Sequence, residues 1–373
     1  MRKLGNIFQL GLKELRSLWF DKALLIFIVW AFTGGVYSAA TGTSRELNRA
    51  PIAIVDHDRS PLSQRIIAAF YPPHFNRPVL IGPAAVDPAL DAGSYTFVVD
   101  IPANFQRDII AGKRPELQVN IDATRMSQAF IGASYIQQIV LGDVTEFLRH
   151  YRAQTVLPIE LQTRVKFNPN LTGLWFGGVM EIMEFVTMLS IILTGAALIR
   201  EREHGTVEHL LVMPLTPFEI MAAKVWANGL VVLVAAYLSL QFVVRGALQV
   251  PISGSVALFV AGAALYLFST TALGIFLATI ARSMPQLGLL VILTIMPLQI
   301  LSGAVTPRES MPLAVQYLMQ ATPTTHFVAL TQAIIYRGAD FSAVWKDFVA
   351  IAAIGAVFFG IALERFRRTV AMA

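Results

Sequence analysis

The fold is decided by residues 174–214, LWFGGVMEIMEFVTMLSIILTGAALIREREHGTVEHLLVMP. Residues 174–199 are apolar over a length that crosses a hydrocarbon core about 30 Å thick, because a helix rises about 1.5 Å per residue. Four alternating charges, Arg200 to Glu203, follow at once, and a shorter apolar stretch comes after them. The pattern predicts a transmembrane helix that ends in a charged segment.

The composition of the whole chain agrees with a membrane protein. Of its 373 residues, 55% are hydrophobic and 14% are charged, with a mean hydropathy of +0.60, whereas a soluble domain carries about 25% charged residues. These values exclude a soluble cytoplasmic enzyme and a disordered chain. The chain contains no cysteine, which excludes disulfide scaffolds, thiolate metal sites and cysteine nucleophiles.

Further apolar segments with the length of a membrane span lie at 23–41, 222–244, 256–281, 286–303 and 345–363. The segment 286–303 is the weakest, because Pro297 interrupts it and Ser302-Gly303 ends it; a bend or a turn back is the alternative to a full crossing. We predict an α-helical polytopic membrane protein of six transmembrane helices, with the first at 23–41 and helices 2–6 within 174–368.

Basic residues indicate which span ends stay in the cytoplasm. One set of ends holds Arg2, Lys3, Lys13, Arg16, Lys22, Arg200, Arg202, Lys224, Arg282, Arg365, Arg367 and Arg368. The opposite set holds Arg245, Arg308, Arg337 and Lys346. This asymmetry predicts that both termini are cytoplasmic. Because the basic residues lie mostly beside apolar segments, the net charge of +5 indicates contact with membrane lipid and not with nucleic acid.

Residues 1–22 predict an N-terminal amphipathic connecting helix on the membrane surface. Their apolar side chains share one helical stripe: Leu4, Ile7, Phe8, Leu12, Leu15 and Trp19. The alternative is a secretory signal peptide cleaved near Ser38-Ala39-Ala40, but the stretch before the apolar core is long and amphipathic for an ordinary n-region.

Residues 44–172 are more polar, with clear turn signals, and predict an independently folded outer α/β domain inserted between transmembrane helices 1 and 2. Helical and extended patterns alternate along this stretch. Strands are expected at 51–56, 79–82, 95–101, 117–122 and 165–168, and helices at 60–70, 104–111 and 124–154.

The charged segment after residue 199 predicts a short rigid helix at 206–213. Gly205 and Pro214 are stop signals on either side of it, and Thr206 can cap its first turn. The alternative interpretation is a charged loop that only stops translocation.

Capping residues define two further segments. Thr216 and Glu219 predict a capping box that opens the third span. Residues 304–343 predict an outer segment, in which the threonines before His326 are expected to cap a helix. Short helices are expected there at 313–320 and 325–336.

Two carboxylates, Glu181 and Glu184, lie on one face of the second span. Counting back from Arg200 at 1.5 Å per residue places them about 24 to 28 Å away, near the outer interface. They either line the outer mouth of a substrate path, as intramembrane carboxylates often do, or are hydrated or paired with the outer domain. The spacing of His204 and His209 matches no metal motif, so no metal site is predicted.

The sequence shows neither G-x-x-x-x-G-K-[ST] nor a G-x-G-x-x-G after a strand, and no catalytic constellation can be placed. We therefore predict a transporter membrane subunit that is not an enzyme and carries no cofactor of its own. ATP and Mg²⁺ would be bound by a partner subunit.

Motifs along the chain carry a family resemblance: Ile54-Val55-Asp56, Ser60 to Ser63, Val98 to Pro102, REREHGTVE at 200–208, Leu301-Ser302-Gly303, PRESMP at 307–312 and PTTHF at 323–327. Together they resemble the ABC-2 type permeases, the membrane subunits of ATP-binding-cassette exporters, and particularly the YhhJ-like group with a large periplasmic domain.

The resemblance implies roles for two sets of residues. Coupling to the ATPase falls to the helix at 206–213 and its flank: Arg200, Glu201, Arg202, Glu203, His204, Gly205, Thr206, Glu208 and Leu211. A re-entrant hairpin before the last span falls to Ser302, Gly303, Pro307, Met311, Pro312 and Pro323.

The resemblance also implies partners and a location. These are an ABC ATPase subunit, a second permease copy or a paralogue, a periplasmic membrane-fusion adaptor and an outer-membrane channel, at the bacterial inner membrane. The leading hypothesis is therefore an exporter driven by a separate ATPase. Two alternatives are an ion-driven secondary transporter that uses Glu181 and Glu184, and a non-transporting scaffold whose outer domain binds partners.

Overall fold

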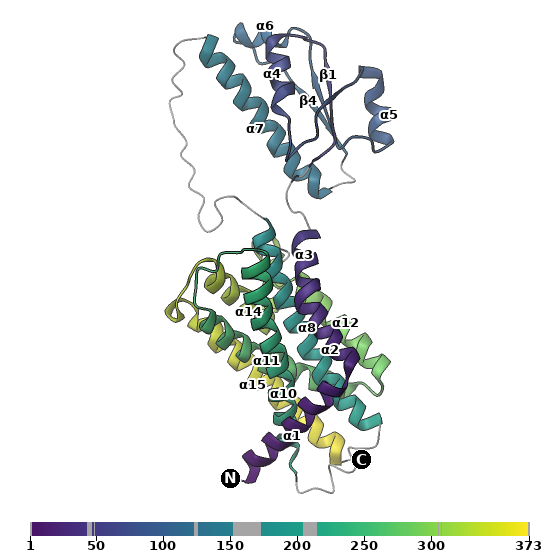
Figure 1. Cartoon of the computed structure of the whole chain (residues 1–373), viewed down its shortest axis with the longest axis vertical. Helices are drawn as coiled ribbons and strands as arrows, with labels where there is room; N and C mark the ends of the chain where they lie inside the picture. Colours follow the sequence, from purple (N-terminus) through teal and green to yellow (C-terminus); the bar gives the residue numbers. More distant parts are fainter. Residues whose placement is uncertain are drawn as a thin grey trace. The chain divides into compact units, whose positions relative to one another are not determined.

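The computed structural model describes residues 2–42, 47, 49–122, 126–151, 173–203, 215–304, 306 and 308–371. The chain is mostly helical and divides into two compact units (Figure 1). A helical unit consists of Met1–Gly42 and Leu174–Ala373, and a second unit consists of Thr43–Gly173. The predicted helix at 206–213 and the predicted strand at 165–168 lie outside the described residues.

The helical unit begins with α1 (Arg2–Phe20), α2 (Lys22–Trp30), a π-helical turn (Ala31–Gly35) and α3 (Val36–Gly42). After the second unit, the chain continues through α8 (Gly173–Glu203), α10 (Pro217–Leu238) with a π-helical end (Ser239–Ala247), α11 (Val256–Ile280) and α12 (Met284–Ile300). It ends with α13 (Leu313–Gln320), α14 (Pro323–Thr331), a π-helical turn (Gln332–Tyr336) and α15 (Phe341–Ala371).

Five helical stretches among the described residues are long and apolar enough to cross a membrane: Lys22–Gly42, Leu174–Glu203, Pro217–Ala247, Val256–Ile280 and Phe341–Arg368. They coincide with five of the six predicted spans. The sixth predicted segment coincides with α12, an apolar helix of 17 residues that contains Pro297. It is shorter than the other five and was also the weakest in the sequence.

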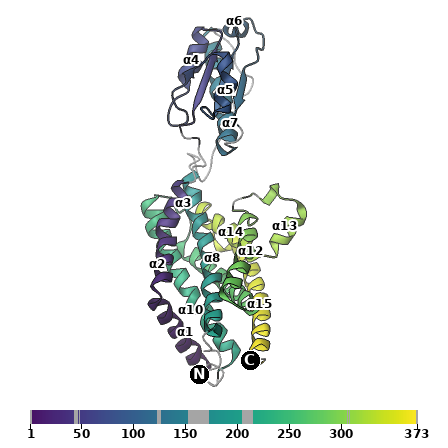
Figure 2. The same cartoon turned by 90° about the vertical axis from the view of Figure 1, so that its right-hand side faces the viewer.

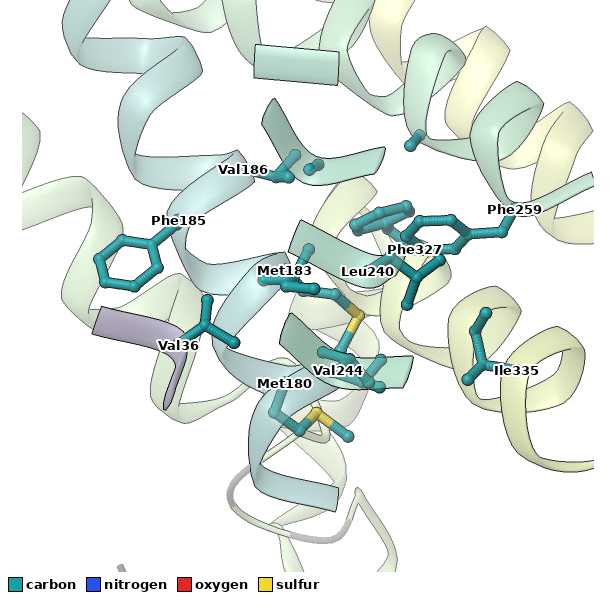
Figure 3. Packing of buried hydrophobic residues seen from close by; sticks show 14 of the residues in the cluster. Val36, Met180, Met183, Phe185, Val186, Leu240, Val244, Phe259, Phe327 and Ile335 are labelled. Carbon is teal, nitrogen blue, oxygen red and sulfur yellow. The ribbon is translucent and has the colours of Figure 1, made fainter. Parts of the chain in front are cut away.

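Helix α8 runs through the middle of the helical unit, as Figures 1 and 2 show. Of the residues in its most apolar stretch, 72% are buried. Its Met183 and Val186 pack in the same cluster as Leu240 and Phe327 (Figure 3). By contrast, only 17% of the residues in the most apolar stretch of α15 are buried. Side chains of α8 therefore form the core, whereas α15 presents most of its surface outward.

The approach of α8 to α11 is unusually close at one point. A Cβ added at Gly274 of α11 would lie 2.6 Å from the carbonyl oxygen of Ile191 on α8, and a Cβ at Gly195 would lie 3.2 Å from the carbonyl oxygen of Gly274. Glycine at both positions permits this contact between backbones.

The second unit contains β1 (Ile52–Asp56), α4 (Pro61–Ala69), β2 (Val79–Leu80), α5 (Val86–Asp91), β3 (Phe97–Ile101), α6 (Phe105–Ile110), β4 (Gln118–Ile121) and α7 (Met126–Tyr151). The four strands form one sheet in the order β2-β1-β3-β4, in which β1 is parallel to β2 and β3, and β4 is antiparallel to β3. The four strands expected between residues 51 and 122 are thus present. Helix α5, which contains Pro88, was not expected.

The two faces of this sheet are covered by different helices (Figure 1). Alternate side chains of β3 separate them: Phe97 and Val99 pack with α4 and α7, and Val98 packs with Val86 of α5. This alternation follows from the two-residue period of a strand. Arg65 of α4 adds an ion pair to Asp143 of α7 at 2.9 Å.

Candidate functional site

A buried cation joins three helices at the charged end of α8. Lys224 of α10 is 2% exposed, and its Nζ lies 2.9 Å from Glu14 Oε1 of α1 and 2.9 Å from Glu201 Oε2 of α8. A buried charge is costly unless oppositely charged groups compensate it. The ammonium of Lys224 therefore holds α1, α8 and α10 together through ion pairs.

Additional charges surround this centre. Lys13 Nζ of α1 lies 3.6 Å from Glu201 Oε1, and Arg200 donates a 3.2 Å hydrogen bond to Asp21. Asp21 also accepts a hydrogen bond from the backbone N–H of Leu24 and so caps α2. Arg200 consequently contacts the residue at which α1 ends and α2 begins.

The next two residues of α8 contact the connection between α11 and α12. Arg202 donates a 2.8 Å hydrogen bond to the carbonyl oxygen of Ala281, and Glu203 accepts one of 3.0 Å from the backbone N–H of Met284. Arg200 to Glu203 thus contact five helices: the start of α2, α1 and α10 through the ion pairs of Glu201, the end of α11 and the start of α12.

The remaining residues predicted for coupling, His204, Gly205, Thr206, Glu208 and Leu211, lie outside the described residues. Lys224 and Glu14 were not identified from the sequence as site residues. The position of Lys224 in the first turns of a span was a signal, since a lysine there requires a partner.

The predicted capping box at the start of α10 is confirmed. Thr216 Oγ1 accepts a hydrogen bond from the backbone N–H of Glu219, and Glu219 Oε2 accepts one of 2.7 Å from the backbone N–H of Thr216. The other carboxylate oxygen of Glu219 accepts a 3.2 Å hydrogen bond from the side-chain amide of Asn6 in α1. The cap therefore also attaches α1 to α10.

Helix α1 packs closely along α10. Trp226 donates a 3.2 Å hydrogen bond from Nε1 to the carbonyl oxygen of Ile7, and its ring stacks on Phe8 with 5.8 Å between ring centroids. Gly11 lies directly against the Trp226 indole, where a Cβ would overlap the ring. This face of α1 is fixed to α10.

The carboxylates Glu181 and Glu184 are both half-buried on α8. Glu184 lines a cavity of about 10 Å³ together with Gln299, Ser302 and Thr324, which is the volume of about one water molecule. The structure thus brings Glu184 next to Ser302 of the predicted hairpin, while Glu181 does not line this cavity.

A line of buried hydroxyl groups continues along α8 from this cavity. Thr187 Oγ1 lies 2.7 Å from the hydroxyl of Tyr266, which donates a 3.2 Å hydrogen bond to Thr324. Further along, Ser190 donates a 2.7 Å hydrogen bond to Thr270. These polar contacts between α8, α11 and α14 could not be inferred from the sequence, because each joins residues far apart in the chain.

The predicted hairpin contains a tight turn and two short helices. Gly303 has φ of +96°, and Ser302 donates a 2.8 Å hydrogen bond to the carbonyl oxygen of Gln299. Met311 is buried, Pro312 precedes α13 at its N-cap, and Pro323 occupies the first turn of α14. Pro307 lies outside the described residues.

His326 of α14 pairs with α15. Its Nδ1 lies 2.9 Å from Asp347 Oδ1, and its Nε2 lies 3.0 Å from the carbonyl oxygen of Gln320. The hydrogen bond to Asp347 raises the pKa of His326, while burial and, to a smaller extent, the charge of Arg308 oppose this. The expectation that Thr324 and Thr325 cap this helix is wrong, since α14 begins at Pro323, so both lie inside the helix, and the N-cap residue makes no side-chain capping hydrogen bond.

Comparison with known proteins places the chain in a family. Residues 22–363 match the family described as ABC-2 family transporter protein. The chain is 61% identical over 370 residues to the inner membrane transport permease YhhJ of Escherichia coli K12, with 99% of each chain covered. It is 30% identical over 360 residues to the probable multidrug ABC transporter permease YbhR of the same organism, covering 96% of this chain and 97% of that one. It is 28% identical over 259 residues to the probable multidrug ABC transporter permease YbhS of Escherichia coli K12, covering 67% of this chain and 66% of that one.

Proposed function

The chain belongs to the ABC-2 family of transporter proteins, and we propose that it is the membrane-spanning subunit of an exporter driven by a separate ATPase. Family membership and the apolar helices make it a multi-pass transport permease of the inner membrane. The proposal adds the direction of transport, the energy source and the route by which that energy enters.

The observation that carries the proposal is the set of contacts made by Arg200 to Glu203. These four residues at the end of α8 contact α1, α2, α10 and both sides of the α11–α12 connection. A displacement applied to this end of α8 would act on all of these elements at once. We place the ATPase contact at the adjoining segment 206–213, in keeping with family resemblance.

The proposed topology has six crossings, with α12 as the shortest, and cytoplasmic termini. The unit Thr43–Gly173 then faces the periplasm and contacts a membrane-fusion adaptor that leads to an outer-membrane channel. A second permease copy or a paralogue completes the path. Two relatives are named as probable multidrug ABC transporter permeases, and we propose small apolar or amphipathic compounds as the substrate class.

Copurification in mild detergent tests the ATPase partnership. We expect a nucleotide-binding protein to accompany the wild-type chain. Less of it is expected with Glu203→Arg, which places a cation at the backbone N–H of Met284. The matched control is Glu364→Arg, a charge reversal at an exposed residue of α15. Absence of any nucleotide-binding protein from the wild-type sample would overturn the proposal.

Transport in vesicles tests the energy source. The copurified complex is reconstituted, and a panel of apolar and amphipathic dyes is followed with ATP alone and with a proton gradient alone. We expect transport with ATP only. Transport driven by the proton gradient alone would favour the ion-driven alternative, in which Glu181 and Glu184 carry protons.

A further inference from the structure

A cavity lies between α1, α2, α8 and α10, next to the ion pairs of Lys224. Its volume is about 260 Å³, slightly below the range of about 300–1,000 Å³ that is typical of drug-sized ligands. A ligand headgroup fits within it, whereas a ligand with long chains would extend beyond it.

The lining of the cavity divides into an apolar and a polar part. Leu18, Leu24 and Leu193 supply apolar surface, and Lys13, Ser17 and Arg200 supply cationic and hydroxyl groups. Leu24 lies in the first turn of the first span, and Leu193 lies two turns before the charged end of α8. The cavity is therefore located where the hydrocarbon core gives way to the polar interface, and its two-part lining suits an amphiphile.

The most exposed charged side chains that line this cavity are cationic, although Lys13 pairs with Glu201 and Arg200 pairs with Asp21. Lys13 and Arg200 have side chains that are 56% and 37% exposed, whereas those of Glu14 and Glu201 are only 12% exposed and point to the buried ammonium of Lys224. An incoming group thus meets one ammonium, one guanidinium and the hydroxyl of Ser17. This set of donors suits the oxygens of a phosphodiester.

The helix that forms one wall carries large apolar side chains on its surface. Phe20 is 81%, Leu4 75% and Trp19 71% exposed, although the opposite face of α1 is fixed to α10 by Trp226. Side chains of this kind on an amphipathic helix indicate that it lies in the lipid interface. Phospholipid is then the amphiphile present at highest concentration beside the cavity.

We propose that this cavity binds the phosphodiester headgroup of a membrane phospholipid, with Lys13, Ser17 and Arg200 as its donors and the acyl chains extending past Leu24 and Leu193. The bound lipid fills the space between α1 and α8 and connects the surface helix to the span that carries the charged run. The site does not depend on the proposed function, because it requires only that the chain is embedded in a membrane.

Photo-crosslinking of the full chain in nanodiscs tests the site. The nanodiscs consist of phosphatidylethanolamine and phosphatidylglycerol with a trace of phospholipid that carries a diazirine at the start of one acyl chain. Adducts are expected on the peptides that contain Leu24 and Leu193. We expect Lys13→Gln with Arg200→Gln to reduce these adducts at least about tenfold, the effect of losing one charge-assisted hydrogen bond.

Matched variants separate binding from folding. Arg16→Gln removes one exposed cation from the same helix but not from the cavity, and should leave the adducts unchanged. Lys13→Gln alone should reduce them, and Lys13→Arg should restore them. Equal labelling in Lys13→Gln and Arg16→Gln would overturn the proposal.

Two competitors identify the source of the phosphate. A diazirine-labelled glyceride without phosphate should not concentrate on these peptides, and millimolar inorganic phosphate should not reduce labelling by the phospholipid. Enrichment of the glyceride would show an apolar groove without headgroup recognition. Displacement by inorganic phosphate would show a site for the free ion, and either result would refute a lipid headgroup site.

Discussion

Replacing Lys224 by methionine should destabilise the helical unit strongly. The side chain is 2% exposed, and its removal leaves Glu14 and Glu201, each 12% exposed, without the ammonium that lies 2.9 Å from both. Breaking a buried ion pair by removing one partner costs about 3–5 kcal/mol, most of it from the charge that is left behind. At about 2 °C per kcal/mol for a unit of the size of the helical one, its melting temperature should fall by about 6–10 °C.

The assay is thermal unfolding in detergent, followed by tryptophan fluorescence. The triple variant Glu14→Gln, Lys224→Met and Glu201→Gln removes all three charges and should recover most of the loss, because no buried charge remains uncompensated. The control Lys346→Met alters an exposed lysine of α15 and should change stability by about 0.5 kcal/mol or less. The reasoning is refuted if Lys224→Met melts like this control, or if the triple variant melts as low as the single one.

Three further predictions concern local contacts. Gly11→Ala should weaken the attachment of α1, because its Cβ would overlap the Trp226 ring; faster proteolysis within α1 measures this, and an unchanged rate would contradict it. Thr216→Ala should cost about 1 kcal/mol through loss of the cap of α10, read from the melting temperature, whereas Thr216→Ser should cost little. The contact of His326 with Asp347 should stabilise the folded protein most below pH about 6.5, the pKa of an unfolded histidine. This stabilisation should disappear as pH rises through the raised pKa of His326 in the folded protein. The free energy of unfolding should therefore fall by roughly 1 kcal/mol between pH 5 and pH 9, and this decrease should be absent in His326→Gln.

The sequence predicted best what depends on neighbouring residues. The capping box at Thr216 and Glu219 is fixed by a spacing of three residues, and the strands of the α/β unit follow from local apolar runs and turns. The spans were predictable from hydropathy, and the Ser302-Gly303 turn that limits the length of α12 was also visible in the sequence. Helix α5 was missed because Pro88 argues against a helix unless it occupies the first turn, as it does here.

Contacts between distant segments could not be predicted. Glu14 and Lys224 are 210 positions apart, and nothing in either local sequence specifies that they meet. The same holds for Tyr266 of α11, whose hydroxyl makes hydrogen bonds with Thr187 of α8 and Thr324 of α14. A polar residue in an apolar span indicates only that some hydrogen-bonding partner exists, because a buried polar group requires one. The local sequence does not identify that partner.

The contacts of α8 differ along its length in a way that bears on how it could move. At its charged end, long side chains connect α8 to the ends of its neighbouring helices through ion pairs and hydrogen bonds, so a shift of this end acts on those helices. Near its middle, Gly195 and Ile191 lie against the backbone of α11 at Gly274, where not even a Cβ would fit on Gly274, so a shift of α8 toward α11 has little room there. A force on the charged end should therefore tilt α8 about this contact, and its other half, which carries Glu184 and the hydroxyl contact of Thr187, should move in the opposite direction.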